Sequence, residues 1–355
     1  MFSMFFGAGN IVFPLAVGQY AADQNFFAIL GLVLTAAVVP ILGVIAMILY
    51  DGDYGRFFGK IGKWPGFLLA FIIISLLGPF GSTPRCIALS YTTMKNFFPE
   101  ISSLVFSFFA CLVIFLFSRK QKHLLRLLGV WLTPILLASL AAILGIGFYS
   151  LPEMRVSQLS GQSAFLHGLE QGYNTMDLLA AFFFSSQIVS ILKKQNREKY
   201  LSYALIASII GACLLACIYI GFSYLAAFHA QDILVRSMDE LLALIIVKIA
   251  GEYGGFIVAL AVALACLTTA IALISAFADF VSRVVCSNKV GYEWILAGSL
   301  AMTFCVSIFE FGAISAFLGP ILQVCYPGLI ALTFWNIFCQ IRTHNPFRAE
   351  ISSER

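Results

Sequence analysis

The feature that most constrains this sequence is a series of ten long apolar stretches, of which only the sixth contains acidic residues, Glu170 and Asp177. Each stretch is close to the roughly 20 residues that a helix needs to cross a bilayer core. Lipid cannot hydrogen-bond to an open backbone, so such stretches fold as helices. They cover residues 1–22, 26–50, 66–84, 101–118, 127–152, about 165–192, 201–228, 253–278, 294–309 and 311–341. The sequence therefore predicts an all-α polytopic membrane protein with about ten transmembrane helices.

Composition supports this prediction and excludes several other classes of protein. Only 11% of the residues are charged and 61% are hydrophobic, whereas soluble domains have roughly 25% charged residues. The net charge of +4 is too small to indicate a nucleic-acid partner. The nine cysteines lie singly in apolar runs, which favours neither disulfides nor a zinc site. Catalytic residue types do not gather at any predicted depth, so we expect neither an enzyme nor a bound cofactor.

The basic residues predict the orientation of the helices. If the first helix starts in the cytoplasm, sixteen Lys and Arg residues fall in inner loops and the tail, and four fall outside. Arg85 remains near the end of the third helix. Such a bias places both termini in the cytoplasm. The inner residues are Arg56, Lys60, Lys63, Arg119, Lys120, Lys122, Arg126, Lys193, Lys194, Arg197, Lys199, Arg283, Lys289, Arg342, Arg348 and Arg355.

Ten helices divide into two halves of five, and an odd number per half gives the halves opposite orientations. We therefore expect one transmembrane domain over residues 1–342, with repeat one at about 1–150, repeat two at about 160–342, and a cytoplasmic tail at 343–355. The pattern Leu-x-Pro-Ile-Leu occurs at 132–136 and again at 318–322, at corresponding places in the two halves. The sequence thus predicts a five-plus-five inverted repeat.

The first helix of each half carries residues that interrupt a helix: Gly7, Ala8, Gly9 and Asn10 in helix one, and Tyr173, Asn174, Thr175, Met176 and Asp177 in helix six. Irregular backbone at membrane depth is tolerated where it is buried in protein or lines a cavity, and paired interruptions are typical of transporter binding sites. Freed amides would meet a carboxylate, and freed carbonyls a cation or ammonium group. These nine residues are the predicted site for a zwitterionic amino acid. Kinked helices packed on glycine are the structural alternative.

Four motifs carry a resemblance to a known family. Residues 5–14 (Phe-Phe-Gly-Ala-Gly-Asn-Ile-Val-Phe-Pro), 78–85 (Gly-Pro-Phe-Gly-Ser-Thr-Pro-Arg), 172–177 (Gly-Tyr-Asn-Thr-Met-Asp) and 265–270 (Ala-Cys-Leu-Thr-Thr-Ala) resemble motifs of the bacterial branched-chain amino acid carriers. These carriers are cation symporters for leucine, isoleucine and valine. The resemblance implies sodium-coupled uptake of these amino acids through a bacterial cytoplasmic membrane. It also implies the inverted-repeat fold of leucine-type sodium symporters, with helices one and six discontinuous.

The resemblance further implies a sodium site between helices one and eight. Its ligands would be the carbonyls of Ser3, Phe6 and Ala265 and the hydroxyls of Thr268 and Thr269, all neutral oxygens that suit Na⁺. Threonine hydroxyls that bond back to their own helix are the structural alternative. By the same resemblance, Asn10 would bridge ion and substrate.

Two charged positions leave alternatives open. Asp177 lies at the predicted midplane, where a carboxyl group is a functional candidate by default. It could bind a cation or an ammonium group, exchange a proton, or pair within the bundle. Arg85 lies about 20 residues into the third apolar stretch, near the outer boundary. It either extends its charge toward the interface or forms an outer gate with Glu170.

Two departures from the family pattern add further alternatives. Family members usually have about twelve helices, and only six residues precede Gly7 here, about 9 Å of helix. A start further upstream or a damaged copy would explain the short first helix. Proton-coupled uptake through Asp177 and a truncated membrane protein that binds its ligand without transport remain alternatives to sodium symport.

Overall fold

The computed structural model describes residues 2–119, 133–149, 151–152, 154–195, 200–229 and 238–343, and every regular element within them is a helix. The prediction of an all-α polytopic membrane protein is confirmed. In order, the main helices are α1 (Phe2–Phe5), α2 (Ala8–Ala21), α3 (Asn25–Val33), α4 (Val39–Leu49), α5 (Tyr54–Phe58), α6 (Lys63–Leu77), α7 (Ser82–Lys95), α8 (Ser103–Ser118), α10 (Thr133–Gly147), α11 (Gly161–Asn174), α12 (Asp177–Gln195), α13 (Tyr200–Phe228), α14 (Met238–Phe280), α15 (Tyr292–Ser307) and α16 (Phe311–Thr343). Short segments of 3₁₀-helix (η1, Ala22–Gln24; η3, Gly59–Ile61) and π-helix (η2, Leu34–Val38; η5, Val281–Val285) join or extend them.

Each predicted apolar stretch coincides with one or more of these helices. Five helical segments in the described part of the chain are long and apolar enough to cross a membrane: Ala8–Leu49, Lys63–Lys95, Ser202–Phe228, Gly255–Val285 and Phe311–Arg342. The first of these contains two predicted stretches, since the chain turns at Ala22, whose φ is 48°. The other stretches form shorter or interrupted helices.

The structure confirms the interruptions predicted in helices one and six. Phe6 and Gly7 separate α1 from α2, and Thr175 and Met176 separate α11 from α12. A third interruption was not predicted. Residues 78–81 separate α6 from α7, because Gly78 is non-helical and a Cβ on Gly81 would overlap the Leu76 carbonyl. The third apolar stretch is therefore not one continuous helix, and α7 begins within the bundle.

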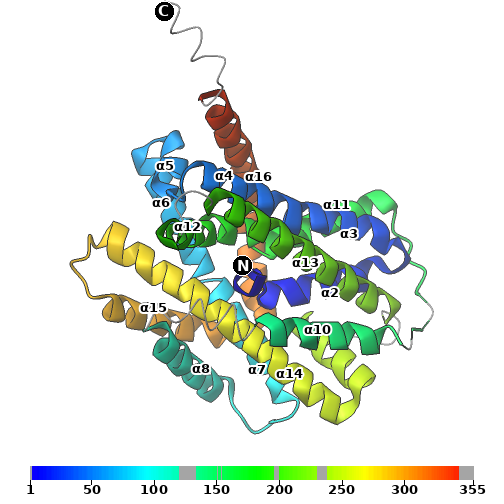
Figure 1. Cartoon of the computed structure of the whole chain (residues 1–355). Coiled ribbons are helices and arrows are strands. Elements are labelled where there is room, and N and C mark those ends of the chain that lie inside the picture. Colours follow the sequence, from blue (N-terminus) through cyan, green and yellow to red (C-terminus); the bar gives the residue numbers. More distant parts are fainter. Residues whose placement is uncertain are drawn as a thin grey trace, which may run out of the picture.

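The packing of the helices repeats between the two halves of the chain. The first helix of one half packs against the second helix of the other half, as α2 against α13 and α11 against α3. The third helices pack on each other, as α7 against α14, and so do the fourth, α8 and α15. Helices α2, α7 and α14 also contact one another, and Figure 1 shows α2 starting beside the amino terminus in the middle of the bundle. This exchange is expected of an inverted repeat, although the boundaries of the two repeats stay a prediction.

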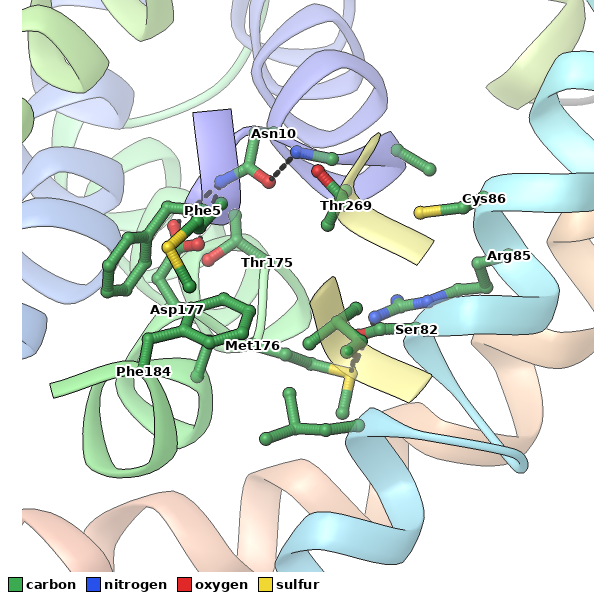
Figure 2. Close-up of a pocket in the computed structure, with 17 residues that line it drawn as sticks. Phe5, Asn10, Ser82, Arg85, Cys86, Thr175, Met176, Asp177, Phe184 and Thr269 are labelled. Atoms are coloured by element: carbon green, nitrogen blue, oxygen red, sulfur yellow. Dashed lines mark hydrogen bonds between the residues drawn. The ribbon is translucent and has the colours of Figure 1, made fainter. Parts of the chain in front are cut away.

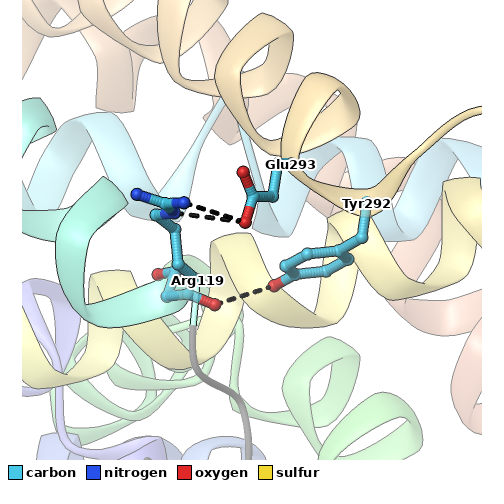
Figure 3. A network of polar contacts seen from close by, with 4 residues as sticks. Arg119, Tyr292 and Glu293 are labelled. Atoms are coloured by element: carbon cyan, nitrogen blue, oxygen red, sulfur yellow. Dashed lines mark hydrogen bonds and ion pairs between the residues drawn. The ribbon is translucent and has the colours of Figure 1, made fainter.

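A polar cluster joins the ends of α8 and α15 (Figure 3). Arg119 Nε and Nη2 each lie 3.2 Å from Glu293 Oε1, and the Tyr292 hydroxyl donates to the Ser118 carbonyl at 3.3 Å. Both charged side chains are about half exposed, at 46% and 56%. An exposed pair of this kind contributes roughly 0–1 kcal/mol. Arg119 is therefore a half-exposed arginine at the end of α8.

Candidate functional site

The interruption in helix one is held open by a side chain from its own second half. The Gly7 amide donates to Asn10 Oδ1 at 2.9 Å, so Asn10 caps the start of α2. Gly7 itself is extended, with φ −122° and ψ −163°. The first amides of a helix have no partner within that helix. The start of α2 therefore turns its positive end toward the centre of the bundle.

The interruption in helix six depends on the backbone of Met176, whose φ of 64° is unfavourable for a residue with a side chain. The Thr175 hydroxyl donates to the Gly172 carbonyl at 2.8 Å and closes the end of α11. Asp177 is then the first residue of α12. Strain of this kind persists only where the surrounding structure holds it, and it concentrates at functional sites.

The two interruptions meet in a buried hydrogen-bond network around Asp177. The Asn10 amide nitrogen donates to Asp177 Oδ1 and Oδ2 at 2.8 and 2.9 Å, and Asn10 also contacts the Tyr219 hydroxyl. Tyr219, on α13, donates to Asp177 Oδ2 at 2.6 Å. All three side chains are buried. A carboxylate has about four acceptor positions, and the Thr175 side chain adds a further contact to those from Asn10 and Tyr219.

The predicted helix eight, residues 253–278, is part of α14 and contacts the carbonyl end of α1 through Thr269. Its hydroxyl lies 2.8 Å from the Phe6 carbonyl and 3.3 Å from the Ser3 carbonyl. Thr268 instead bonds back to the Ala265 carbonyl at 2.8 Å, within its own helix. Three of the five predicted sodium ligands thus converge across the α1–α14 interface, while Ala265 and Thr268 pair with each other. All five predicted ligands are neutral oxygen atoms, which suit Na⁺.

Arg85 is buried, so its charge does not extend toward the membrane interface, and that sequence-based alternative was wrong. Its side chain is 1% exposed, Nη1 donates to the Asn174 carbonyl at 3.0 Å, and Nη2 lies 2.6 Å from Met176 Sδ. The physical reason is the unpredicted interruption before α7, which places Arg85 in the first turn of a new helix. Glu170 is exposed, and no ion pair joins it to Arg85 among the described residues.

These groups surround one narrow cavity, shown in Figure 2. Of the nine predicted substrate-binding residues, Gly7 to Asn10 and Thr175 to Asp177 line it. Tyr173 and Asn174 do not line it. The Tyr173 ring packs at a tilt against Tyr326 with 4.7 Å between ring centroids, and the Asn174 carbonyl accepts from Arg85. The remaining lining residues are Met4, Phe5, Leu77, Ser82, Arg85, Cys86, Ala180, Phe184, Thr269 and Leu273.

The cavity combines opposite charges with an apolar wall. Arg85 extends from α7 on one side and Asp177 lies on the other (Figure 2), while Phe5, Phe184 and Leu273 supply apolar surface. The free volume is about 20 Å³, room for about one water molecule. A larger ligand would have to displace the side chains that now fill the space.

Sequence reasoning missed Tyr219 and Ser82. Tyr219 lies within an apolar helix, where a tyrosine is usually read as packing, and its contact with Asn10 joins residues 209 positions apart. Ser82 donates to Met176 Sδ at 3.3 Å. Its signal was present in the Gly-Pro-Phe-Gly run just before it, which interrupts the helix and turns Ser82 toward the cavity.

Comparison with known proteins gives a consistent result. Residues 1–351 match the family described as branched-chain amino acid transport protein. The chain is 29% identical over 340 residues to the branched-chain amino acid permease BrnQ of Corynebacterium glutamicum, covering 95% of this chain and 79% of that protein. It is 30% identical over 359 residues to a protein of Staphylococcus epidermidis described as a branched-chain amino acid carrier, covering 94% of this chain and 79% of the relative. The chain therefore belongs to the branched-chain amino acid transport protein family.

Proposed function

We propose that this protein imports leucine, isoleucine and valine across a bacterial cytoplasmic membrane, with both termini in the cytoplasm. Sodium symport would supply the driving force, and alternating access would expose the central cavity to each side in turn. The observation that carries this proposal is the meeting of the two interrupted helices at Asn10 and Asp177, in a cavity with apolar walls. Transporters with inverted repeats bind their substrates at such interruptions.

The cavity chemistry matches an amino acid with an aliphatic side chain. Asp177 offers a carboxyl group to the substrate ammonium group, and the first amides of α2, at Ala8 and Gly9, offer partial positive charge to its carboxylate. Phe5, Phe184 and Leu273 give the side chain an apolar surface. Burial of an aliphatic group of this size contributes about 1.5–3 kcal/mol.

The sodium ion would bind beside this cavity, where the carbonyls of Ser3 and Phe6 approach the Thr269 hydroxyl. Ala265 and Thr268 would complete the ligand set if the Thr268 hydroxyl turned from its own helix toward α1. Thr269 also lines the substrate cavity. An ion held there would therefore stabilise the same arrangement of α1 and α2 that the substrate needs, which is the basis of coupling.

The test is uptake of radiolabelled leucine into proteoliposomes that contain the purified chain. An inward sodium gradient is compared with an equal choline gradient and with an imposed pH gradient. We expect accumulation with sodium alone. Leucine that binds without accumulating would contradict transport and favour a ligand-binding protein instead.

A proton-coupled symporter is the second candidate, and the burial of Asp177 favours it. The side chain is 1% exposed and no Lys or Arg forms an ion pair with it within the described residues. Asp177→Asn would preserve the shape and remove the titratable group. Under sodium symport the wild type needs sodium; under proton coupling its uptake survives sodium removal and is lost in Asp177→Asn.

A further inference from the structure

Arg85 is a buried guanidinium whose described contacts include no carboxylate. Nη1 donates to one backbone carbonyl, that of Asn174, and Nη2 contacts the thioether of Met176. Nε is buried without an acceptor. The guanidinium lies 5.6 Å from the Phe13 ring centroid and 5.9 Å from that of Phe311. A guanidinium has five N–H donors. These few contacts to neutral groups leave some of its donors unused and its positive charge without a negative partner.

The acidic residue of the same cavity does not supply the missing anion. Asp177 interacts electrostatically with Arg85, but no ion pair within 4 Å joins them among the described residues. Its carboxylate instead accepts from Asn10 and Tyr219. The cavity therefore presents a positive group on α7 and a negative group on α12, which line it from different helices. That arrangement is complementary to a zwitterion.

Met176 occupies the position at which an anion would contact Arg85. Its sulfur receives two donors, Arg85 Nη2 at 2.6 Å and the Ser82 hydroxyl at 3.3 Å (Figure 2). A thioether is a weak acceptor. Hydrogen bonds between a guanidinium and a carboxylate are about twice as strong as hydrogen bonds between neutral groups. Met176 also has the strained backbone of the helix-six interruption, with φ 64°. A ligand that displaced this side chain would exchange weak contacts for strong ones.

We propose that the carboxylate of the substrate amino acid displaces the Met176 thioether and binds to Arg85 and Ser82. This inference rests on the proposed function and adds a specificity determinant to it. The first amides of α2, whose residues line the same cavity, add partial positive charge, while Arg85 provides the full charge. Ligands must then carry an anionic group beside the ammonium group, and amines of the same shape are rejected because Arg85 would stay uncompensated.

Leucine and leucinol test this directly, because leucinol keeps the ammonium group and side chain and replaces the carboxylate with a hydroxymethyl group. Equilibrium binding of both is measured on the purified full-length protein in nanodiscs. We expect the wild type to prefer leucine. In Arg85→Gln, leucine affinity should fall about 10- to 100-fold, the range for a charge-assisted hydrogen bond, while leucinol affinity stays equal or rises.

Two further variants keep the test decisive if Arg85→Gln does not fold. Ser82→Ala removes only one donor at a partly exposed position and should lower leucine affinity several-fold without changing leucinol affinity. Arg119→Gln removes an arginine from the exposed pair of Figure 3 and should change neither.

Each outcome has a distinct meaning. A wild type that binds no branched-chain amino acid overturns the proposed function. A wild type that binds leucine and leucinol equally, or an Arg85→Gln or Ser82→Ala variant that keeps the wild-type preference, overturns the role of Arg85 and leaves the proposed function standing.

Discussion

A single methyl group at Gly7 tests the contact between helix one and helix eight. The backbone there is extended, so alanine is conformationally acceptable and only space decides the effect. A Cβ on Gly7 would lie 2.9 Å from Thr269 Cγ2, 3.4 Å from Thr269 Cβ and 3.5 Å from Cys86 Sγ. Carbon atoms in ordinary contact are about 3.5 Å apart or more. In Gly7→Ala, Thr269 must therefore retreat by about 0.6 Å.

That displacement acts on the proposed sodium site. The Thr269 hydroxyl lies 2.8 Å from the Phe6 carbonyl and 3.3 Å from the Ser3 carbonyl, and the longer contact has almost no range to spare. Overpacking of a core costs about 1–3 kcal/mol. If this cost falls on the ion-binding arrangement, the half-saturating sodium concentration for leucine uptake rises about 5- to 150-fold.

The assay is leucine uptake into proteoliposomes as a function of external sodium, with a rescue variant as the control. Thr269→Ser removes Cγ2 and keeps the hydroxyl, so it should be close to wild type alone and should restore sodium activation when combined with Gly7→Ala. The interaction energy of this double-mutant cycle should be about 0.5–3 kcal/mol. A Gly7→Ala protein with wild-type sodium activation, or additive effects in the double variant, would refute the steric argument.

Three other predictions follow from the described contacts. Thr269→Val leaves a buried carbonyl without its donor and should raise the half-saturating sodium concentration by roughly tenfold, more than Thr268→Val, whose hydroxyl bonds within its own helix; equal effects of the two would contradict this. Tyr219→Phe removes the donor 2.6 Å from Asp177 and should lower leucine affinity about tenfold in equilibrium binding, so an unchanged affinity would exclude Tyr219 from the site. Gly18→Ala would push a Cβ into the backbone of α13, whereas Gly312→Ala enters open space; thermal unfolding in detergent should show a loss of several degrees for the first and no change for the second.

The sequence is sufficient to predict the helices and two of the interruptions because those signals are local. Hydropathy over about 20 residues reports each span. Glycines before Asn10, and a polar run ending at Asp177, interrupt apolar helices in ways that can be read from a few adjacent residues. The five-residue stretch from Gly7 to Ile11 already contains the amide and the side-chain oxygen that cap α2.

The third interruption and its consequence for Arg85 were missed for a different physical reason. Gly78 and Pro79 lie inside an apolar stretch of the right length, so hydropathy counts them as part of a helix. The need for glycine at 78 comes from Phe277, on a helix nearly 200 residues away, against which a Cβ at Gly78 would lie 2.8 Å. Counting residues along a continuous helix therefore gave no sign that Arg85 would line the cavity.

The three interruptions are linked, because polar side chains connect the helix ends at the centre of the bundle. Thr269 of helix eight donates to the carbonyls that end α1, and Arg85 of helix three donates to the Asn174 carbonyl that ends α11. Asn10 caps α2 and at the same time donates to Asp177 at the start of α12. Irregular backbone at membrane depth is tolerated only where such contacts, or a cavity, satisfy its polar groups. A ligand that replaces any one of these contacts therefore alters the partners of the next, and coupling between an ion and an amino acid requires only that both ligands favour the same set of contacts.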